Sequence, residues 1–492
     1  MDYVAVFDIG TTAIKGLLVN RAVEPLGEQT IELTTYIEDG NVEQQPEDWW
    51  EAIKKIAATW WQSGISPHSI RAITFSGQME DLITVSKTEK KYRAILYSDT
   101  RAGEEAGEVM GKFPDLRNVT GNNMSATTPL AKISWLQKHR KEQYKDAKKF
   151  VFCAKDFIIY KLTGVAVTDP VTGATTGMMD LTKRKWHEPI VDGCGVDISK
   201  LPNLIDVKEI VGTVSKTASK VSGFSSSTFI INGSGDAGAS TLGAGSIQVK
   251  DGYFYLGTTG WLAMVEKNDT NENLSEGHFN LAFVQEDQRI SVAPLLNVGN
   301  VHNWAVHSFC EETENSYVAF ESLIETVAPG SEGVVFLPYL YGERNPIHDP
   351  DAKGAYWGVS SSTTKKHLAR AALEGVTFSL KQTLEMFEVE DKRTITLIGG
   401  GSKSETWCQM MADIMNHPIR VPLNSEYLPS IGIASSAFLA LGWMESYEQF
   451  IDQHVKTVPS KHYYPNEANV QKYESQYTLF KRLYPALRTM YQ

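Results

Sequence analysis

The stretch VAVFDIGTTAIKGLLVN, residues 4–20, places one acid, two hydroxyls and a lysine between two apolar runs. Residues 4–7 and 14–19 are predicted as strands, with Asp8 and a glycine turn between them. A similar stretch, YFYLGTTGWLAMVE, occupies residues 253–266. Two strand–turn–strand units that each begin one half of a chain indicate an internal duplication. Two unrelated hairpins are the alternative, because Gly and Thr are common in turns.

The length and composition bound the possibilities. A chain of 492 residues exceeds the usual size of one hydrophobic core, so we expect at least two domains. The boundary is predicted between residues 247 and 248, just before the second hairpin. The apolar fraction of 42% and charged fraction of 22% are ordinary for a globular protein. A net charge of −12 argues against a general nucleic-acid binder.

The cysteines and the chain ends predict a cytoplasmic protein. Cys153, Cys194, Cys310 and Cys408 form no C-x-x-C pair, so we expect four buried, reduced thiols rather than a zinc site. The first strand begins almost at once, without a basic segment before an apolar one, which argues against a signal peptide. No apolar run reaches about 18 residues, so no membrane partner is expected.

Strands and helices alternate along the chain, which predicts an α/β architecture. A helix is expected from Pro46, with Trp and Ile at helical spacing, and one long buried strand is expected over residues 70–86. The region from residue 127 to about 164 is predicted to be helical. The glycine-rich turn NGSGDAG precedes a predicted helix of small residues that starts near Asp236.

The hairpin turns have the groups needed to hold phosphate. Free N–H groups and threonine hydroxyls donate hydrogen bonds to phosphate oxygens, although the pattern is not a Walker A loop. The carboxylate of Asp8, at the strand end, would contribute to phosphate binding if a Mg²⁺ ion lies between it and the phosphates. Lys15 could add a positive charge. The alternative for Asp8 is that it only caps the turn, and the alternative for Lys15 is that it is a solvated surface lysine.

Two further segments place acids after buried strands. Asp236 could accept a proton from an attacking hydroxyl, or it could only cap the helix that follows it. The segment SGQMED supplies Gln78, Glu80 and Asp81, which suit a neutral polyol better than an anion, unless they are simply solvated loop acids. Three glycines in LIGGGSKSETW would let a base or ribose approach the backbone, although a tight turn needs them too.

Taken together, the segments resemble the FGGY family of carbohydrate kinases over nearly the whole chain. The match runs through FDIGTTAIKG, EQQPEDWW, TFSGQMED, KDFIIYKLTG, NGSGDAGASTLGAG, YLGTTGW and FLPYLYGERNP to GGGSKSETWCQMMADI. The motifs are most similar to those of xylulokinases. The resemblance implies a two-domain actin-like ATPase (ribonuclease H-like) fold with duplicated halves and a central cleft. It also implies ATP, Mg²⁺ and a sugar as ligands, with sugar and base on residues 1–247 and nucleotide on residues 248–492.

The resemblance assigns roles by position. Asp236 matches the catalytic base, and Asp8 matches the residue near Mg²⁺. The candidate nucleotide-site residues are Asp8, Thr11, Thr12, Lys15, Thr258, Thr259, Gly299, Asn303, Gly400, Gly401 and Ser404. The candidate sugar-site residues are Gln78, Met79, Glu80 and Asp236.

Two departures bear on the substrate. Xylulokinases usually carry His where this chain has Glu80, whereas glycerol kinases carry a glutamate there. The amide that often follows the catalytic aspartate is replaced by Ala237. D-xylulose or a related ketose is the first expectation, with a glycerol- or erythritol-type polyol or gluconate as alternatives. An actin-like ATPase or a sugar-sensing regulator without kinase activity is the non-enzyme alternative. A homodimer is expected from family analogy only.

Overall fold

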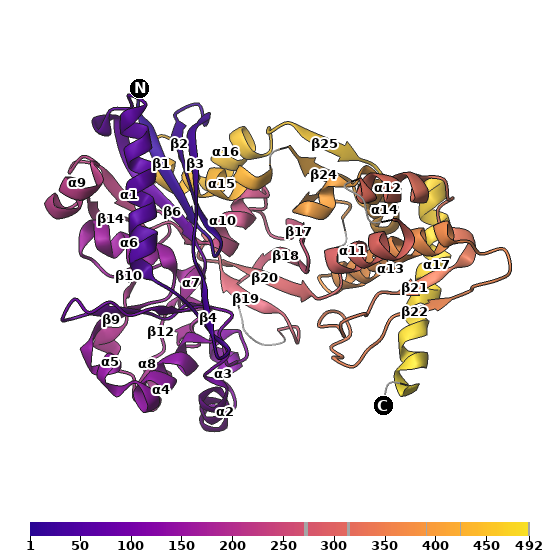
Figure 1. The fold of residues 1–492 in the computed structure, drawn as a ribbon, viewed down its shortest axis with the longest axis horizontal. Coiled ribbons are helices and arrows are strands. Elements are labelled where there is room, and N and C mark those ends of the chain that lie inside the picture. Colours follow the sequence, from indigo (N-terminus) through magenta and orange to yellow (C-terminus); the bar gives the residue numbers. More distant parts are fainter. Residues whose placement is uncertain (270–273, 312–314, 390, 424, 491–492) are drawn as a thin grey trace.

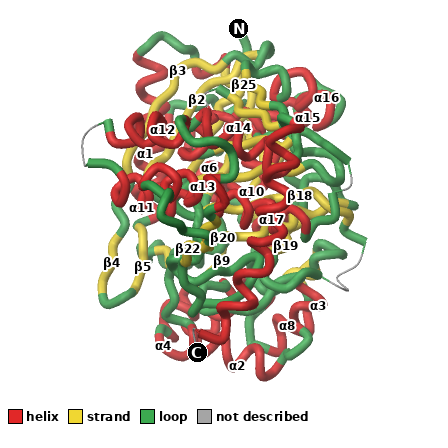
Figure 2. Tube along the Cα trace, turned by 90° about the vertical axis from the view of Figure 1, so that its right-hand side faces the viewer, coloured by secondary structure: helices red, strands yellow, loops and turns green. Residues whose placement is uncertain are grey.

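The computed structural model describes residues 1–269, 274–311, 315–389, 391–423 and 425–490, which form two sheet-rich halves (Figure 1). The N- and C-termini lie at opposite ends of the molecule (Figure 2). Among the described residues, no helix is both long and apolar enough to cross a bilayer.

Each half is built on a seven-stranded sheet, here called the N-terminal and the C-terminal sheet. The N-terminal sheet contains β1 (Tyr3–Ile9), β2 (Ala13–Asn20), β3 (Pro25–Glu32), β6 (Ile70–Gly77), β14 (Ile210–Thr213), β15 (Phe229–Ile231) and β16 (Ser234–Gly235). The C-terminal sheet contains β17 (Gly252–Leu256), β18 (Gly260–Lys267), β19 (Phe279–Ala282), β20 (Gln288–Leu295), β23 (Ile395–Ile398), β24 (Ile419–Pro422) and β25 (Ser460–Tyr463).

Six strands of each sheet follow the same order of pairing, while β16, beside β6, and β19, beside β20, have no counterpart in the other sheet. In the N-terminal sheet, β1 pairs antiparallel with β2 and parallel with β6. In the C-terminal sheet, β17 pairs antiparallel with β18 and parallel with β23. The same order continues outward, from β6 to β15 and β14 in one sheet and from β23 to β24 and β25 in the other. The predicted internal duplication is therefore confirmed.

Helices make up much of the rest of each half. The helices of the first half are α1 (Pro46–Gln62), α2 (Gly103–Lys112), α3 (Leu116–Thr120), α4 (Pro129–His139), α5 (Lys141–Asp146), α6 (Ala154–Thr163), α7 (Pro170–Gly173), α8 (Glu188–Gly193), α9 (Lys216–Ser222) and α10 (Asp236–Gly243). Those of the second half are α11 (Gly299–Phe309), α12 (Ser316–Glu325), α13 (Lys365–Glu385), α14 (Glu405–Met415), α15 (Leu428–Ala440), α16 (Tyr447–Phe450) and α17 (Glu467–Leu487).

The remaining strands form small sheets. These are β4 (Tyr36–Glu38) with β5 (Asn41–Gln44) and β8 (Ala94–Ile95), β7 (Ile83–Ser86) with β9 (Ala147–Val151), β10 (Val167–Thr168) with β13 (Asn203–Leu204), β11 (Met179–Asp180) with β12 (Lys185–Trp186), and β21 (Val335–Leu337) with β22 (Ala355–Trp357).

Strand β1 shows how the sequence orients its acid. Because side chains alternate along a strand, one set points toward α1, where the Phe7 and Trp60 rings lie 5.4 Å apart. The other set, which includes Val4 and Val6, packs in a core with residues of α10 and α15. Asp8 continues this second face, so its carboxylate emerges on the α10 side of the sheet.

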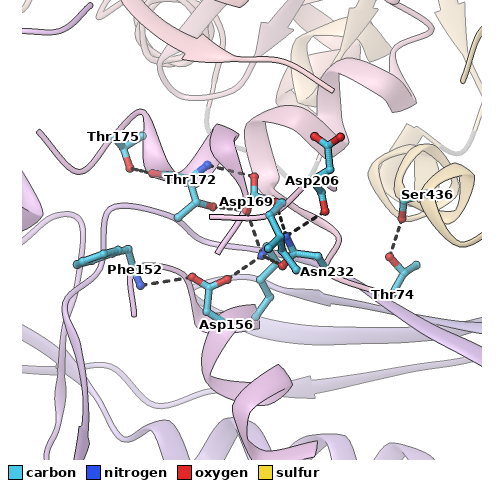
Figure 3. Close-up of polar contacts among 11 residues, drawn as sticks. Thr74, Phe152, Asp156, Asp169, Thr172, Thr175, Asp206, Asn232 and Ser436 are labelled. Atoms are coloured by element: carbon cyan, nitrogen blue, oxygen red, sulfur yellow. Dashed lines mark hydrogen bonds and ion pairs between the residues drawn. The ribbon is translucent and has the colours of Figure 1, made fainter. Parts of the chain in front are cut away.

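Helix α15, from late in the sequence, packs on the N-terminal sheet beside α10 (Figure 1). Small residues make the approach possible: a Cβ on Gly432 would lie 2.4 Å from the backbone nitrogen of Gly243. The Thr74 and Ser436 hydroxyls also share a hydrogen bond of 2.8 Å between β6 and α15 (Figure 3). The small-residue stretches thus serve close helix packing.

Three local predictions were wrong. The strand expected over residues 70–86 is interrupted after Gly77, and Glu80 in the gap adopts a left-handed φ of 64°. The helical region expected over residues 127–164 contains β9, because this segment pairs with β7 across the fold. All four cysteines are free, but only Cys153 and Cys408 are buried.

Candidate functional site

Asp8 lies beside a lysine and a serine from the two neighbouring strands. Lys15 on β2 and Ser76 on β6 are its partners in register, so the three side chains share one face of the sheet. Burial raises the pKa of Asp8, while the Ser76 hydroxyl and the Lys15 charge act in the opposite direction. Lys15 is half-buried at this place.

The first hairpin turn is held by a chain of side-chain hydrogen bonds. Thr11 Oγ1 donates to Gln78 Oε1 over 2.7 Å. Gln78 Nε2 donates to Gln44 Oε1 over 3.1 Å, and Gln44 Nε2 donates to the Thr11 carbonyl over 2.6 Å. Trp49 Nε1 donates to the same Gln44 oxygen over 2.9 Å. Gln78, predicted at the sugar site, therefore has both ends of its amide engaged in supporting the turn.

Asp236 is the first residue of α10 and follows Gly235 at the N-cap position, and its carboxylate interacts with the backbone N–H of Ala237. It is accessible to solvent, although protein surrounds it on most sides. This environment raises the pKa of Asp236 to about 7, with burial as the largest cause and the charges of Asp8 and Asp169 adding to it. A carboxylate with such a pKa can exchange a proton near neutral pH.

Glu80 and Asp81 lie beside the buried Lys132, and Asp81 is near enough to Asp236 for their charges to interact. Lys132 Nζ donates to the Glu80 carbonyl over 2.8 Å and to the Leu96 carbonyl over 2.7 Å. Burial lowers the pKa of Lys132 to about 8, although the negative charges of Glu80 and Asp81 act to raise it. Burial raises the pKa of Asp81, and the charges of Asp236 and Glu80 raise it further. The predicted acids are thus brought together.

The side chain of Glu80 accepts a hydrogen bond from Thr127 Oγ1 over 3.0 Å. A cavity of about 20 Å³ lies beside it, which is room for about one water molecule. The lining residues are Glu80, Asn122, Asn123, Thr128, Thr175, Gly177 and Phe279. This cavity is therefore smaller than a sugar.

Phe279, at the start of β19, also lines the cavity beside Glu80, which the sequence did not predict. Its neighbour Asn280 is joined to the first half by reciprocal bonds, in which Asn280 N donates to Asn122 Oδ1 over 2.7 Å and Asn122 Nδ2 donates to the Asn280 carbonyl over 2.7 Å. No motif signals this contact, because 158 residues separate the partners.

A buried ion cluster supports the turn that carries Asp236. Lys155 Nζ lies 2.7 Å from Asp156 Oδ1 and 3.0 Å from Asp169 Oδ2, and all three side chains are fully buried. Lys155 also donates to Asn232 Oδ1 over 3.4 Å, and Asn232 begins the turn (Figure 3). Burial alone lowers the pKa of Lys155, but the two carboxylates outweigh it and the pKa lies above its usual value.

The second half contains a cavity of about 770 Å³ next to the second hairpin. Its lining includes six of the predicted nucleotide-site residues, which are Thr258, Gly299, Asn303, Gly400, Gly401 and Ser404. A space of this size and mixed polarity suits a small-molecule ligand. Thr259, like Thr12 on the first hairpin, is exposed and does not line this cavity.

Helix α12 supplies cavity residues that the sequence did not reveal. Glu321 Oε2 accepts a hydrogen bond from Ser404 Oγ over 2.7 Å, and Tyr317 donates its hydroxyl to Asn303 Oδ1 over 2.6 Å. His302 on α11 also lines the cavity, and burial lowers its pKa to about 4, so the ring is neutral. No motif precedes α12, so only the three-dimensional contacts identify these residues.

Helix α11 begins against the second hairpin. Gly299 N donates to the Gly257 carbonyl over 3.0 Å, and Asn300 N donates to the Thr258 carbonyl over 2.8 Å. A Cβ on Gly299 would lie 2.2 Å from the Gly257 carbonyl oxygen, which only a backbone shift could relieve. The glycine thus fixes the distance between the helix and the turn.

We expect Gly299→Ala to raise the KM for ATP by about tenfold or more, since the new methyl displaces the hairpin backbone. Gly107→Ala is the matched control, because Gly107 is exposed on α2, does not line the cavity, and its Cβ would meet nothing within 4 Å. Steady-state kinetics with varied ATP measure both variants. Equal KM values for the two would contradict the proposed role of this contact.

Family models match most of the chain. The model for the N-terminal domain of the FGGY family of carbohydrate kinases matches residues 3–243. The model for the C-terminal domain of the same family matches residues 252–441.

Individual proteins are similar over their full length. A xylulose kinase of Bacillus subtilis is 30% identical, with 98% of this chain and 97% of that protein aligned. A gluconokinase of Bacillus subtilis is 28% identical, with 100% and 97% aligned. The crystal structure of a ligand-bound xylulose kinase from Lactobacillus acidophilus matches with a TM-score of 0.88 and 26% identity, covering 100% of this chain and 99% of that one.

Proposed function

Because the chain belongs to the FGGY family of carbohydrate kinases, we propose that it transfers the γ-phosphate of ATP to a hydroxyl of D-xylulose or a related ketose. The family makes it a phosphotransferase with an alcohol group as acceptor, and its fold is the two-domain, duplicated fold expected from the sequence. The observation that carries the mechanism is the placement of Asp236, a solvent-accessible carboxylate with a pKa of about 7 at the start of α10.

Asp236 accepts the proton of the acceptor hydroxyl while that oxygen attacks the γ-phosphorus in line. Backbone N–H groups of both hairpin turns and the hydroxyls of Thr12, Thr258 and Thr259 hold the phosphate oxygens. Thr11 contributes through its backbone N–H, because its hydroxyl donates to Gln78. Gly299, Asn303, Gly400, Gly401 and Ser404 hold the nucleotide. We propose residues 1–247 as the sugar and base domain and residues 248–492 as the nucleotide domain.

The residues present fit one Mg²⁺ carried by the nucleotide. Mg²⁺ is usually held by one or two carboxylates together with phosphate oxygens and water. Asp8 offers one carboxylate, and no group of three or more His, Cys, Asp or Glu suited to a metal occurs among the described residues. When bound, Mg²⁺ supplies charge neutralisation at the phosphates. Lys15 beside Asp8 adds a second positive charge.

The ketose assignment is supported by the relatives called xylulose kinases. Glu80, held by Thr127, offers carboxylate oxygens to neutral hydroxyls. The same residue favours a polyol as the next candidate. Gluconate is the third, since a gluconokinase is among the relatives, but its carboxylate would meet Glu80, Asp81 and Asp236. A sensor without kinase activity would need no solvent-accessible base beside Asp8.

A coupled ATP assay with ketopentoses, polyols and gluconate tests the proposal. We expect D-xylulose or a related ketose to give the highest kcat/KM, and Glu80→Gln to lower kcat/KM for it by about tenfold or more, because a charge-assisted hydrogen bond is lost. Thr175→Ser, which changes another side chain beside the Glu80 cavity conservatively, is the matched control. Preference for gluconate would overturn the ketose assignment, and ATP turnover independent of any sugar would overturn the kinase role.

A further inference from the structure

A second large cavity, of about 660 Å³, lies away from the nucleotide-site residues. One wall is the connection from the end of α10 to β17, residues 244–252, and the others come from β23, β24, β25 and the segment after α16. None of the residues assigned above to sugar, base or nucleotide lines it. It therefore requires its own explanation.

The lining is cationic in a protein of net charge −12. Arg393, Arg420 and Lys456 contribute positive charges, His462 adds a ring, and Asp251 is the one carboxylate among the lining residues. Both oxygens of Asp251 are engaged, Oδ2 by the backbone N–H groups of residues 247 and 248 and Oδ1 by Arg393 at 3.5 Å. The cavity thus offers donors rather than acceptors.

Arg420 is buried, with only 6% of its surface exposed, and no carboxylate among the described residues pairs with it. Its nitrogens donate to Ser460 Oγ over 3.1 Å, to the Val455 carbonyl over 2.6 Å and to the Ala244 carbonyl over 3.5 Å. Burial lowers the pKa of Arg420, and nothing nearby acts against this. A buried cation without a counter-charge is costly unless an anion joins it.

The two more exposed cations of the lining already have carboxylate partners. Lys456 Nζ lies 2.9 Å from Asp452, and Arg393 pairs with Asp391 at 2.7 Å. Arg393 also donates to the Val249 carbonyl over 2.7 Å and lies 3.5 Å from Asp251, so an anion would add to these contacts rather than replace them. The exposed Lys456 pair contributes little, so the Lys456 side chain can turn toward an anion. A Cβ on Gly245 would lie 3.4 Å from Lys456 Cγ and 3.6 Å from Arg420 Nη1, which shows how closely these cations approach the connection.

We propose that this cavity binds a phosphate group, as free inorganic phosphate or on a phosphorylated sugar, through Arg393, Arg420 and Lys456. Arginine and lysine donors around one oxyanion are the usual chemistry of phosphate recognition. The volume exceeds that of phosphate alone and leaves space for an attached sugar. An occupant contacts the connection that follows α10, the helix that begins with Asp236.

Calorimetric titration with inorganic phosphate, and separately with ribose 5-phosphate, tests the proposal on the full chain. The variant is Arg393→Gln/Lys456→Gln, which spares the buried Arg420. The matched control is Lys216→Gln/Lys220→Gln, which removes the same charge from exposed positions of α9. We expect the cavity variant to weaken binding of at least one probe by about tenfold or more, while the control binds as the unaltered protein does.

A third variant, Lys403→Gln, reports on the nucleotide cavity, which Lys403 lines. Binding that is lost in this variant but kept in Arg393→Gln/Lys456→Gln would overturn the proposal. So would the absence of binding up to about 10 mM of either probe, which corresponds to very weak affinity. Tighter binding of ribose 5-phosphate than of phosphate would identify a phosphorylated sugar as the ligand, and the reverse would identify inorganic phosphate. Because the readout is binding, the outcome is independent of the kinase assay.

Discussion

Asp236→Asn lowers kcat for sugar phosphorylation by about three orders of magnitude, because the amide cannot accept the proton of the attacking hydroxyl. The affinity for ATP changes little, because Asp236 does not line the nucleotide cavity. Steady-state kinetics and equilibrium ATP binding measure the two effects. Asp192→Asn, an exposed change of the same kind, is the control and keeps full activity.

The pH profile separates loss of the base from a general defect. The pKa of Asp236 is raised to about 7, so the carboxylate is protonated and inactive below that pH. We expect kcat/KM of the unaltered protein to fall by about tenfold per pH unit below this value and to level off above it. The residual activity of Asp236→Asn lacks this step. Normal turnover by the variant would exclude Asp236 as the base.

Lys155→Met lowers the free energy of unfolding by about 3–5 kcal/mol, because it leaves Asp156 and Asp169 buried without their cation. Denaturant unfolding measures this loss. The turn that begins at Asn232 also loses its bond to Lys155, so activity falls with stability.

Two comparisons make this second prediction specific. Combining Lys155→Met with Asp156→Asn and Asp169→Asn neutralises the cluster and restores most of the lost stability, since a neutral set has no uncompensated charge. Lys161→Met on the same helix breaks a half-exposed pair with Glu47 at 3.7 Å and a contact of the ammonium with the Phe157 ring, and it costs about 1 kcal/mol or less. If Lys155→Met unfolds like the unaltered protein, the cluster is not an important support of the fold.

The sequence predicted the features that depend on neighbouring residues. The two hairpins are recognisable because runs of apolar residues flank a Gly-Thr-Thr turn, and the turn occurs near the start of each half. The position of Asp236 follows from the glycine-rich turn and the helix after it. The family motifs also located Thr258, Gly299 and Gly400, which line one cavity.

The parts that could not be predicted depend on contacts between distant segments. Strand β9 forms because β7 offers it a partner, although its own sequence lies in a helical region. Gln78 was expected to face the sugar, but Thr11 and Gln44 occupy its amide. Glu321 reaches the nucleotide cavity only because α12 packs near Ser404. Single-sequence patterns carry no information about such pairings.

The packing of α15 on the N-terminal sheet has a consequence for biosynthesis. The ribosome makes β1 and β6 within the first 77 residues, whereas the helix that covers Val4 and Val6 spans residues 428–440. The nascent chain therefore carries an apolar sheet face without its final cover until translation is nearly finished. Chaperones that shield such surfaces are the expected companions of this chain during its synthesis.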